Sequence, residues 1–128
     1  MPALTFKPQF ADKVEAGMKR QTIRPRRKVP IRTGQTLLLR AWTGAPYLTK
    51  QRVLGQAICR SVDGIVIHDE GIELSPGTLR VFFMRQGGSR QRGLDKFAGA
   101  DGFADWTEMR AWFEKTHGLP FEGVLIKW

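Results

Sequence analysis

The chain has 128 residues, of which 41% are hydrophobic, and a formal net charge of +9. This length predicts one domain, residues 1–128, whose core needs no metal or disulfide staple. The single cysteine, Cys59, excludes an internal disulfide and a thiolate metal cluster, and we predict no metal or other cofactor. No apolar run approaches the roughly 20 residues that span a bilayer, and the N-terminus lacks a signal-peptide pattern. We therefore expect a cytoplasmic protein without a membrane partner.

The positive charge is concentrated in the first half of the chain. Residues 1–52 hold twelve Lys/Arg against two Asp/Glu, whereas residues 53–128 hold nine against ten. A surface with such an excess attracts polyanions through long-range steering. Nucleic acid is the commonest polyanion in the cytosol, so the charge distribution predicts a nucleic-acid ligand.

The first elements in chain order are a strand, a helix and two further strands. Residues 4–6 predict a short edge strand. Pro8 suits the first turn of a helix, with Phe10, Val14 and Met18 on one face and Gly17 as its end. The residues QTIR at 21–24 then predict a short strand, and the apolar run at 33–42 predicts a buried one.

The middle of the chain predicts an antiparallel meander followed by a loop. Residues 52–62 and 64–68 are strand candidates separated by a turn at Asp63-Gly64. The run at 79–84 fits a strand or a helix equally well. The basic, glycine-rich residues 85–93 predict a mobile loop, and residues 94–98 a helical turn.

The C-terminal elements are the clearest. Asp105 and Glu108 have the spacing of a capping box, and the helix that follows carries an apolar stripe of Trp106, Met109, Trp112 and Phe113. Gly118 and Pro120 end it, and residues 121–128 predict a last strand. Together the elements predict an α+β fold, a small antiparallel β-barrel with flanking helices, in which Trp42, Trp106 and Trp112 belong to the core and His117 is structural.

Residues 16–28 contain many cationic side chains and form a candidate binding or catalytic site. Thr22 and Arg24 lie two residues apart on a strand and therefore share a face, and Lys19 at the preceding junction is long enough to reach them. Such a trio can bind a phosphate or a nucleobase carbonyl, or Lys19 can activate the Thr22 hydroxyl if its pKa is lowered. Equally, Thr22 can be an ordinary strand residue among solvated cations. Further cations extend a phosphate-binding track: Arg20, Arg26, Arg27 and Lys28.

The residues GMKRQTIR at 17–24 resemble the G-x-K-x-x-T-x-R signature of the ASCH family, a small β-barrel related to the PUA domains that bind RNA. The stretches at 34–42, 96–113 and 121–128 resemble other elements of that family. The resemblance implies a PUA-like barrel, with RNA or a nucleoside ligand as the partner and a basic cleft as the site.

Some ASCH proteins are amidohydrolases that deacetylate N4-acetylcytidine with a lysine, a threonine and a glutamate. By this resemblance Lys19, Thr22 and Asp101 are the candidate catalytic residues, with Asp101 one methylene shorter than the family's residue. Cleavage of single-stranded RNA is a second activity in the family.

The stretch at 44–52 offers further contacts for RNA. Tyr47 can stack a base, while Lys50 and Arg52 can contact phosphates; alternatively Tyr47 is a half-buried lid over a loop. We expect binding of RNA or a modified nucleobase, with hydrolysis as the alternative. A protein-interaction module and the oligomeric state are left open.

Overall fold

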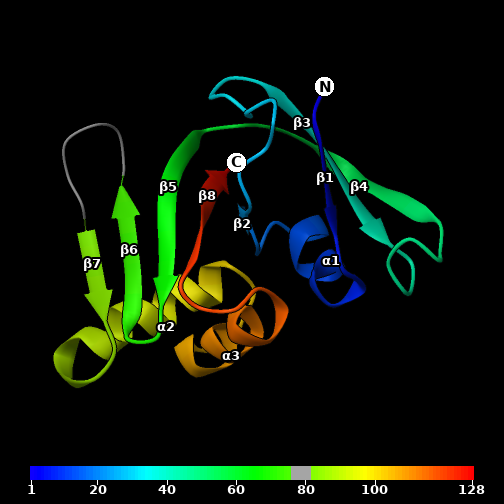
Figure 1. Ribbon diagram of the computed structural model, residues 1–128. Coiled ribbons are helices and arrows are strands. Elements are labelled where there is room, and N and C mark those ends of the chain that lie inside the picture. The colour runs from blue at the N-terminus through cyan, green and yellow to red at the C-terminus, as the bar shows by residue number, and fades with distance from the viewer. Residues whose placement is uncertain (76–81) are drawn as a thin grey trace.

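The computed structural model describes residues 1–75 and 82–128, which fold into strands and helices that share one hydrophobic core (Figure 1). In chain order the elements are β1 (Ala3–Phe6), α1 (Pro8–Glu15), β2 (Gln21–Arg24), β3 (Thr36–Trp42), β4 (Gln51–Ile58), β5 (Ser61–His68), β6 (Gly71–Ser75), β7 (Phe82–Arg85), the 3-10 turn η1 (Gly88–Arg90), α2 (Gln91–Ala100), α3 (Trp106–Thr116) and β8 (Phe121–Lys127).

The described strands form two sheets, one with the order β1-β3-β4 and the other with the order β2-β8-β5-β6-β7. The predicted α+β class is confirmed. Within the described residues the two sheets are not closed into a barrel, so the predicted barrel is not confirmed. The expectation of purely antiparallel strands was wrong, because β1 pairs with β3 in parallel. The connection between them carries α1, and such a crossover is what a parallel pair requires.

The first helix begins at Pro8 and ends at Glu15. Gly17 follows with a φ of 76°, a left-handed conformation that favours glycine and turns the chain toward β2. Phe10 and Val14 are buried as predicted, but Met18 is 72% exposed. Its assignment to the apolar face was wrong because the helix has ended before it.

The predicted turn at Asp63-Gly64 was wrong, since both residues lie inside β5. The chain changes direction at Cys59 and Arg60, and β4 and β5 belong to different sheets rather than to one meander. Figure 1 shows the resulting long bent ribbon. The Cys59 amide donates to the Gln35 carbonyl and the Arg60 amide to the Lys127 carbonyl, so the two backbone groups at the bend are tied to opposite sheets.

The predicted mobile loop at residues 85–93 was also wrong. Arg85 ends β7, η1 follows, and Gln91 already begins α2, which is longer than the predicted turn. The Gln91 side chain accepts a hydrogen bond from the Gly87 amide and so fixes the helix start. Of the ambiguous run at 79–84, residues 82–84 belong to strand β7, while residues 79–81 lie outside the described residues.

The predicted helix at α3 is confirmed, including its cap. The Asp105 carboxylate accepts a hydrogen bond from the Glu108 amide at 2.9 Å, and the Glu108 carboxylate accepts one from the Ala104 amide. Trp106, Met109 and Phe113 are buried and join the core between the sheets and helices α2 and α3. The predicted core position of Trp106 is therefore correct.

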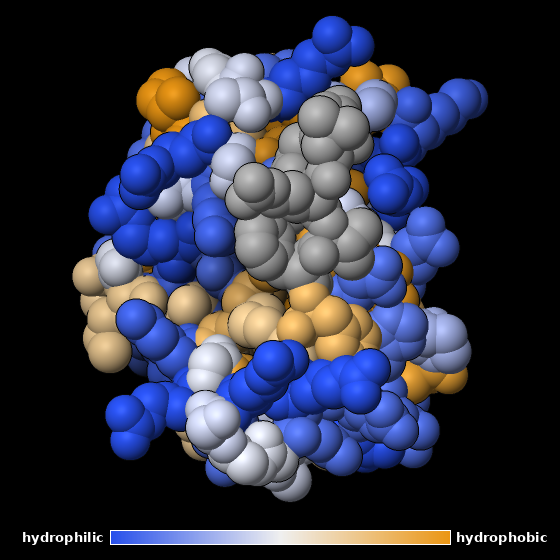
Figure 2. Space-filling view, turned by 90° about the vertical axis from the view of Figure 1, so that its left-hand side faces the viewer, coloured by the Kyte–Doolittle hydropathy of each residue, from blue (hydrophilic) through white to orange (hydrophobic). Residues whose placement is uncertain are grey.

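The outer surface on the β7 side is mostly hydrophilic, with an apolar band across its middle (Figure 2). None of the helices in residues 1–75 and 82–128 has the length and apolar character needed to cross a bilayer.

Candidate functional site

Strand β2 divides two hollows because its side chains alternate between its faces. It is the edge strand of the five-stranded sheet and pairs only with β8 among the described strands. Thr22 and Arg24 share one face, as predicted, and the Arg24 Nε donates a hydrogen bond to Thr22 Oγ1 at 3.0 Å. The neighbouring Gln21 lines the hollow on the other side.

The hollow on the Thr22 side, called the aromatic cavity below, has a volume of about 310 Å³. Its polar lining includes Lys19, Thr22, Arg24 and Asp101. Its walls are mainly aromatic and include Phe6, Phe10, Trp42, Tyr47, Phe103 and Trp112. The cavity therefore combines apolar walls with a few polar groups, which is typical of small-molecule sites.

Lys19 and Asp101 meet in this cavity, although they are far apart in the sequence. The Lys19 Nζ donates a hydrogen bond to the Asp101 backbone carbonyl and lies 3.4 Å from the carboxylate Oδ1. Both residues are 3% exposed. The Gln21 amide donates to the same Oδ1 at 3.4 Å. The pair is thus a buried ion pair with a second polar partner.

The loop after α2 holds this pair in place. Asp101 is the C-cap of α2, and Gly102 follows with a φ of 96°. A Cβ at Gly102 would lie 2.9 Å from the Phe10 ring and 3.1 Å from Lys19 Cδ. Only glycine allows the backbone to approach so closely, and this approach lets the short Asp101 side chain reach Lys19.

Burial changes the pKa values of Lys19 and Asp101 in the directions that favour the neutral forms of both groups. Desolvation lowers the pKa of Lys19 below its usual 10.5, against the opposing charge of Asp101. Desolvation also raises the pKa of Asp101 above its usual 3.8, against the charge of Lys19. The Lys19 ammonium lies 5.1 Å from the Phe10 ring centroid, which favours its charged form. The position is therefore one at which a lysine can lose its proton more readily than in water.

Arg24 is the third polar group of the cavity. Its Nη2 donates to the Thr5 carbonyl at 2.9 Å, and its guanidinium lies 4.9 Å from the Phe6 ring centroid. Since Arg24 also donates to Thr22 Oγ1, the threonine hydroxyl keeps its own hydrogen for another acceptor. Within the described part of the chain, no hydrogen bond joins Thr22 to Lys19 directly.

The aromatic wall contains residues that sequence reasoning missed. Trp42 and Trp112 both line the cavity and are half-buried. Trp112 also packs against the core, as predicted, whereas Trp42 lies outside the described core cluster, so its assignment to the core was wrong. His117 also lines it, and desolvation lowers its pKa. Apolar residues at helical spacing can lie in the core or in the wall of a cavity. The sequence of α3 therefore does not indicate that Trp112 lines a cavity.

Tyr47 lies at the edge of the cavity. It is 88% exposed, so the alternative of a half-buried lid was wrong. Its ring centroid is 5.1 Å from that of Trp42, and its φ is 64°, an uncommon value for a residue other than glycine. The loop between β3 and β4 thus presents one aromatic ring to solvent beside another.

The remaining predicted cations lie outside the cavity. Arg26, Arg27 and Lys28 are exposed in the segment after β2, and Lys50 is exposed before β4. Arg52 forms ion pairs with two carboxylates of α1, Glu15 at 3.0 Å and Asp12 at 3.6 Å. Arg52 is therefore already paired within the chain.

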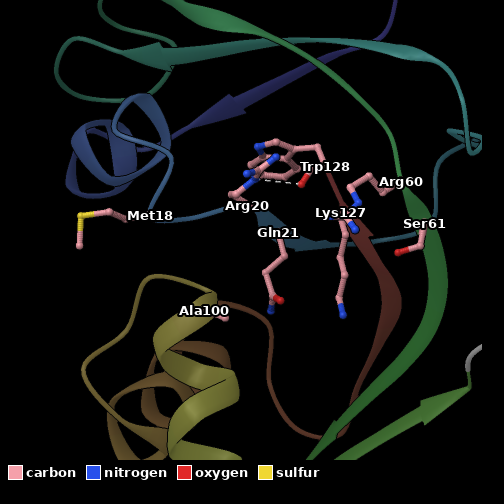
Figure 3. Close-up of a pocket in the computed structure, with 8 residues that line it drawn as sticks. All are labelled: Met18, Arg20, Gln21, Arg60, Ser61, Ala100, Lys127 and Trp128. Atoms are coloured by element: carbon pink, nitrogen blue, oxygen red, sulfur yellow. Dashed lines mark hydrogen bonds between the residues drawn. The ribbon is translucent and has the colours of Figure 1, made fainter.

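Arg20 lies in the second hollow, on the Gln21 side of β2, which we call the basic pocket (Figure 3). This pocket has a volume of about 540 Å³ and is lined by Arg20, Gln21, Arg60, Ser61, Lys127 and Trp128 together with the small side chain of Ala100 and with Met18. The structure thus separates Arg20 from Lys19, its neighbour in the sequence.

The fold and the aromatic cavity define an α+β protein in which a buried lysine–carboxylate pair closes a cavity with aromatic walls. Among the described residues, no group of three His, Cys, Asp or Glu side chains could hold a metal ion. Comparison with family models, curated proteins and solved structures gives no match. The resemblance to the ASCH family therefore stays a prediction.

Proposed function

We propose that the aromatic cavity binds a nucleobase, either an unstacked base of single-stranded RNA or a modified nucleoside. The observation that carries the proposal is the combination of an aromatic wall with the buried donors Lys19 and Thr22 and the half-buried donor Arg24. Aromatic side chains stack on the faces of bases, while buried cationic donors hydrogen-bond to base carbonyls and ring nitrogens.

The size of the cavity supports a single base as the ligand. Its volume of about 310 Å³ is at the small end of the range for ligand sites. One base with part of its ribose fits such a volume, whereas a duplex does not. A PUA-like relationship and an RNA ligand, both suggested by the resemblance, are parts of this proposal, as is the cytoplasmic location expected from the sequence.

Hydrolysis of an acyl amide on the base is the second candidate function, and the convergence of Lys19 and Asp101 favours it. In this reaction Thr22 Oγ1 attacks the acyl carbon, and its proton passes to the neutral Lys19 Nζ. The carbon–nitrogen bond breaks and Lys19 returns the proton to the leaving amine. Water then hydrolyses the acyl ester on Thr22.

Arg24 and Asp101 support two parts of this reaction. Arg24 donates to Thr22 Oγ1 and stabilises negative charge as it develops there. Asp101 orients Lys19 and limits the fall in its pKa. Cleavage of RNA is less well supported, because it needs a separate general acid and general base at a phosphate. Lys19 and Asp101 are paired with each other, and His117 supplies the one imidazole among the described residues of the cavity.

The test uses N4-acetylcytidine with the wild-type protein and with Thr22→Val and Thr22→Ser. Calorimetry measures binding, and chromatography measures release of cytidine and acetate. Binding by all three proteins, with product formed by the wild type and Thr22→Ser but not by Thr22→Val, supports hydrolysis. Binding without product supports a binding protein. Absence of binding to the folded wild type would contradict the proposal.

A further inference from the structure

Three cations from different segments line the basic pocket: Arg20, Arg60 and Lys127. Gln21, Lys127 and Ser61 are direct cross-strand partners, because Lys127 of β8 pairs with Gln21 of β2 on one side and with Ser61 of β5 on the other. Directly opposed residues of antiparallel strands project from the same face. These three side chains therefore form one row across the sheet, with the ammonium group of Lys127 in the middle.

Arg20 and Arg60 flank this row. The Arg60 amide donates to the Lys127 carbonyl at 2.7 Å, which holds the bend between β4 and β5 against the end of β8. Trp128 fixes both the backbone and the side chain of Arg20. The Arg20 carbonyl accepts a hydrogen bond from the Trp128 amide at 3.0 Å, and the Arg20 Nε donates one to the Trp128 carbonyl at 3.2 Å. Figure 3 shows these side chains around one hollow.

The described lining of the pocket is basic. It has no carboxylate side chain, and none of the described ion pairs involves Arg20, Arg60 or Lys127. Like charges that line one pocket repel one another, and a bound anion reduces this repulsion. Arginine, lysine, amide and hydroxyl donors together match the oxygens of a phosphate group.

We infer that the basic pocket binds a backbone phosphate of single-stranded RNA, separately from the base in the aromatic cavity. This inference rests on the proposed function, since it assumes that the ligand is RNA. The two hollows meet at β2, because Gln21 lines the basic pocket and the next three residues line the aromatic cavity. Gln21 also donates to Asp101 of the cavity. RNA then contacts the protein through a stacked base in one hollow and through charge in the other.

The test compares two double variants that remove the same charge. Arg60→Gln with Lys127→Gln removes two cations of the pocket, and Arg90→Gln with Arg92→Gln removes two exposed cations near the start of α2. Binding of a labelled oligocytidylate is measured over a salt series, and binding of N4-acetylcytidine is measured in parallel. Thermal unfolding checks that all proteins are folded.

The inference predicts that the pocket variant binds the oligonucleotide more weakly at low salt. The slope of log affinity against log salt becomes shallower by about 0.7, the value for one phosphate of a single strand. The control variant keeps the wild-type slope, and all three proteins bind the neutral nucleoside equally. Equal slopes for the two double variants would overturn the inference, because net charge alone would then explain the binding.

The nucleoside separates this inference from the proposed function. A wild type that binds N4-acetylcytidine but not the oligonucleotide overturns the phosphate site and leaves the aromatic cavity supported. Oligonucleotide binding that depends on Arg60 and Lys127, without any nucleoside binding, supports the phosphate site and contradicts the role of the cavity.

Discussion

The two hollows beside β2 are built on one four-residue strand, yet their polar groups have very different environments. In the aromatic cavity Lys19, Thr22 and Asp101 are 3% to 4% exposed and contact one another or Arg24. In the basic pocket Arg20, Arg60 and Lys127 are exposed to solvent. Because the side chains of a strand alternate between its faces, neighbouring residues such as Gln21 and Thr22 belong to different sites.

The difference shows how burial decides what a charge can do. Desolvation lowers the pKa of Lys19 and raises the pKa of Asp101, so both groups take their neutral forms more readily than in water. Water and salt screen the exposed cations of the basic pocket, so these cations affect one another only weakly. They can still attract an anion. We therefore expect variants of the buried Lys19–Asp101 pair to change stability, and variants of the exposed pocket cations to change binding alone.

The largest effect is expected from Lys19→Met, which leaves the Asp101 carboxylate buried without its cation. Breaking a buried ion pair in this way lowers the free energy of unfolding by about 3–5 kcal/mol. The pKa of Asp101, already raised by burial, rises further without Lys19. Between 3.8 and the folded pKa, the folded variant then binds more protons than the unfolded chain. Its stability therefore increases as the pH falls.

Urea unfolding over a pH series measures this change. The deficit relative to wild type should be largest near neutral pH and should shrink in acid. A deficit that is constant with pH would show that lost packing, and not the unpaired carboxylate, is responsible.

Asp101→Asn should have the second-largest effect, about 3 kcal/mol near neutral pH, because it leaves the Lys19 ammonium buried without a carboxylate. The pKa of Lys19 then falls further. The unfolded chain binds more protons between that folded pKa and 10.5, so the stability of the variant rises with pH across this range. Its deficit should shrink in alkali, opposite to that of Lys19→Met.

The double variant Lys19→Met with Asp101→Asn is the control for both, and its loss should be smaller than the sum of the single losses. Additive losses in urea unfolding would contradict a direct interaction between the two side chains.

Tyr47→Ala should weaken nucleoside binding about tenfold, because stacking on an aromatic ring contributes roughly 1–3 kcal/mol per base. Tyr47 is 88% exposed, so the stability of the protein should not change. Leu48→Ala is the matched control, since Leu48 is 86% exposed and is not part of the described cavity lining. Calorimetry with N4-acetylcytidine measures the affinities, and an equal loss in both variants would exclude a specific contact with Tyr47.

Arg60→Gln should have the smallest effect on stability, less than about 0.5 kcal/mol, as is usual for exposed positions away from special contacts. Thermal and urea unfolding measure this change. A loss as large as that of Asp101→Asn would show that Arg60 is a structural residue and would remove the contrast between the two hollows.

Local patterns predicted the elements whose determinants are close in sequence. Three examples are the start of α1 at Pro8, the Asp105 cap of α3 and the shared face of Thr22 and Arg24. Each depends on residues of the same helix or the same strand. The turn at Asp63-Gly64 was predicted wrongly because pairing with β6 and β8 overrides the local turn preference and keeps both residues in β5.

The candidate site was predictable only in part for the same reason. Residues 19–24 carried a readable pattern, and the family resemblance added Asp101, which the structure brings to Lys19. The roles of Trp112 and Lys127 depend on which elements pack beside β2. No local pattern encodes that arrangement, and the basic pocket in particular requires the register that aligns Gln21, Lys127 and Ser61.

The most direct measurement is residue-resolved NMR of the wild-type protein during a titration with N4-acetylcytidine. We predict saturable shifts at Thr22, Tyr47 and Phe103, which line the aromatic cavity, and unchanged signals at Ser61 and Lys127 in the basic pocket. An unchanged spectrum, or shifts confined to Ser61 and Lys127, would contradict the claim that the aromatic cavity is the nucleobase site.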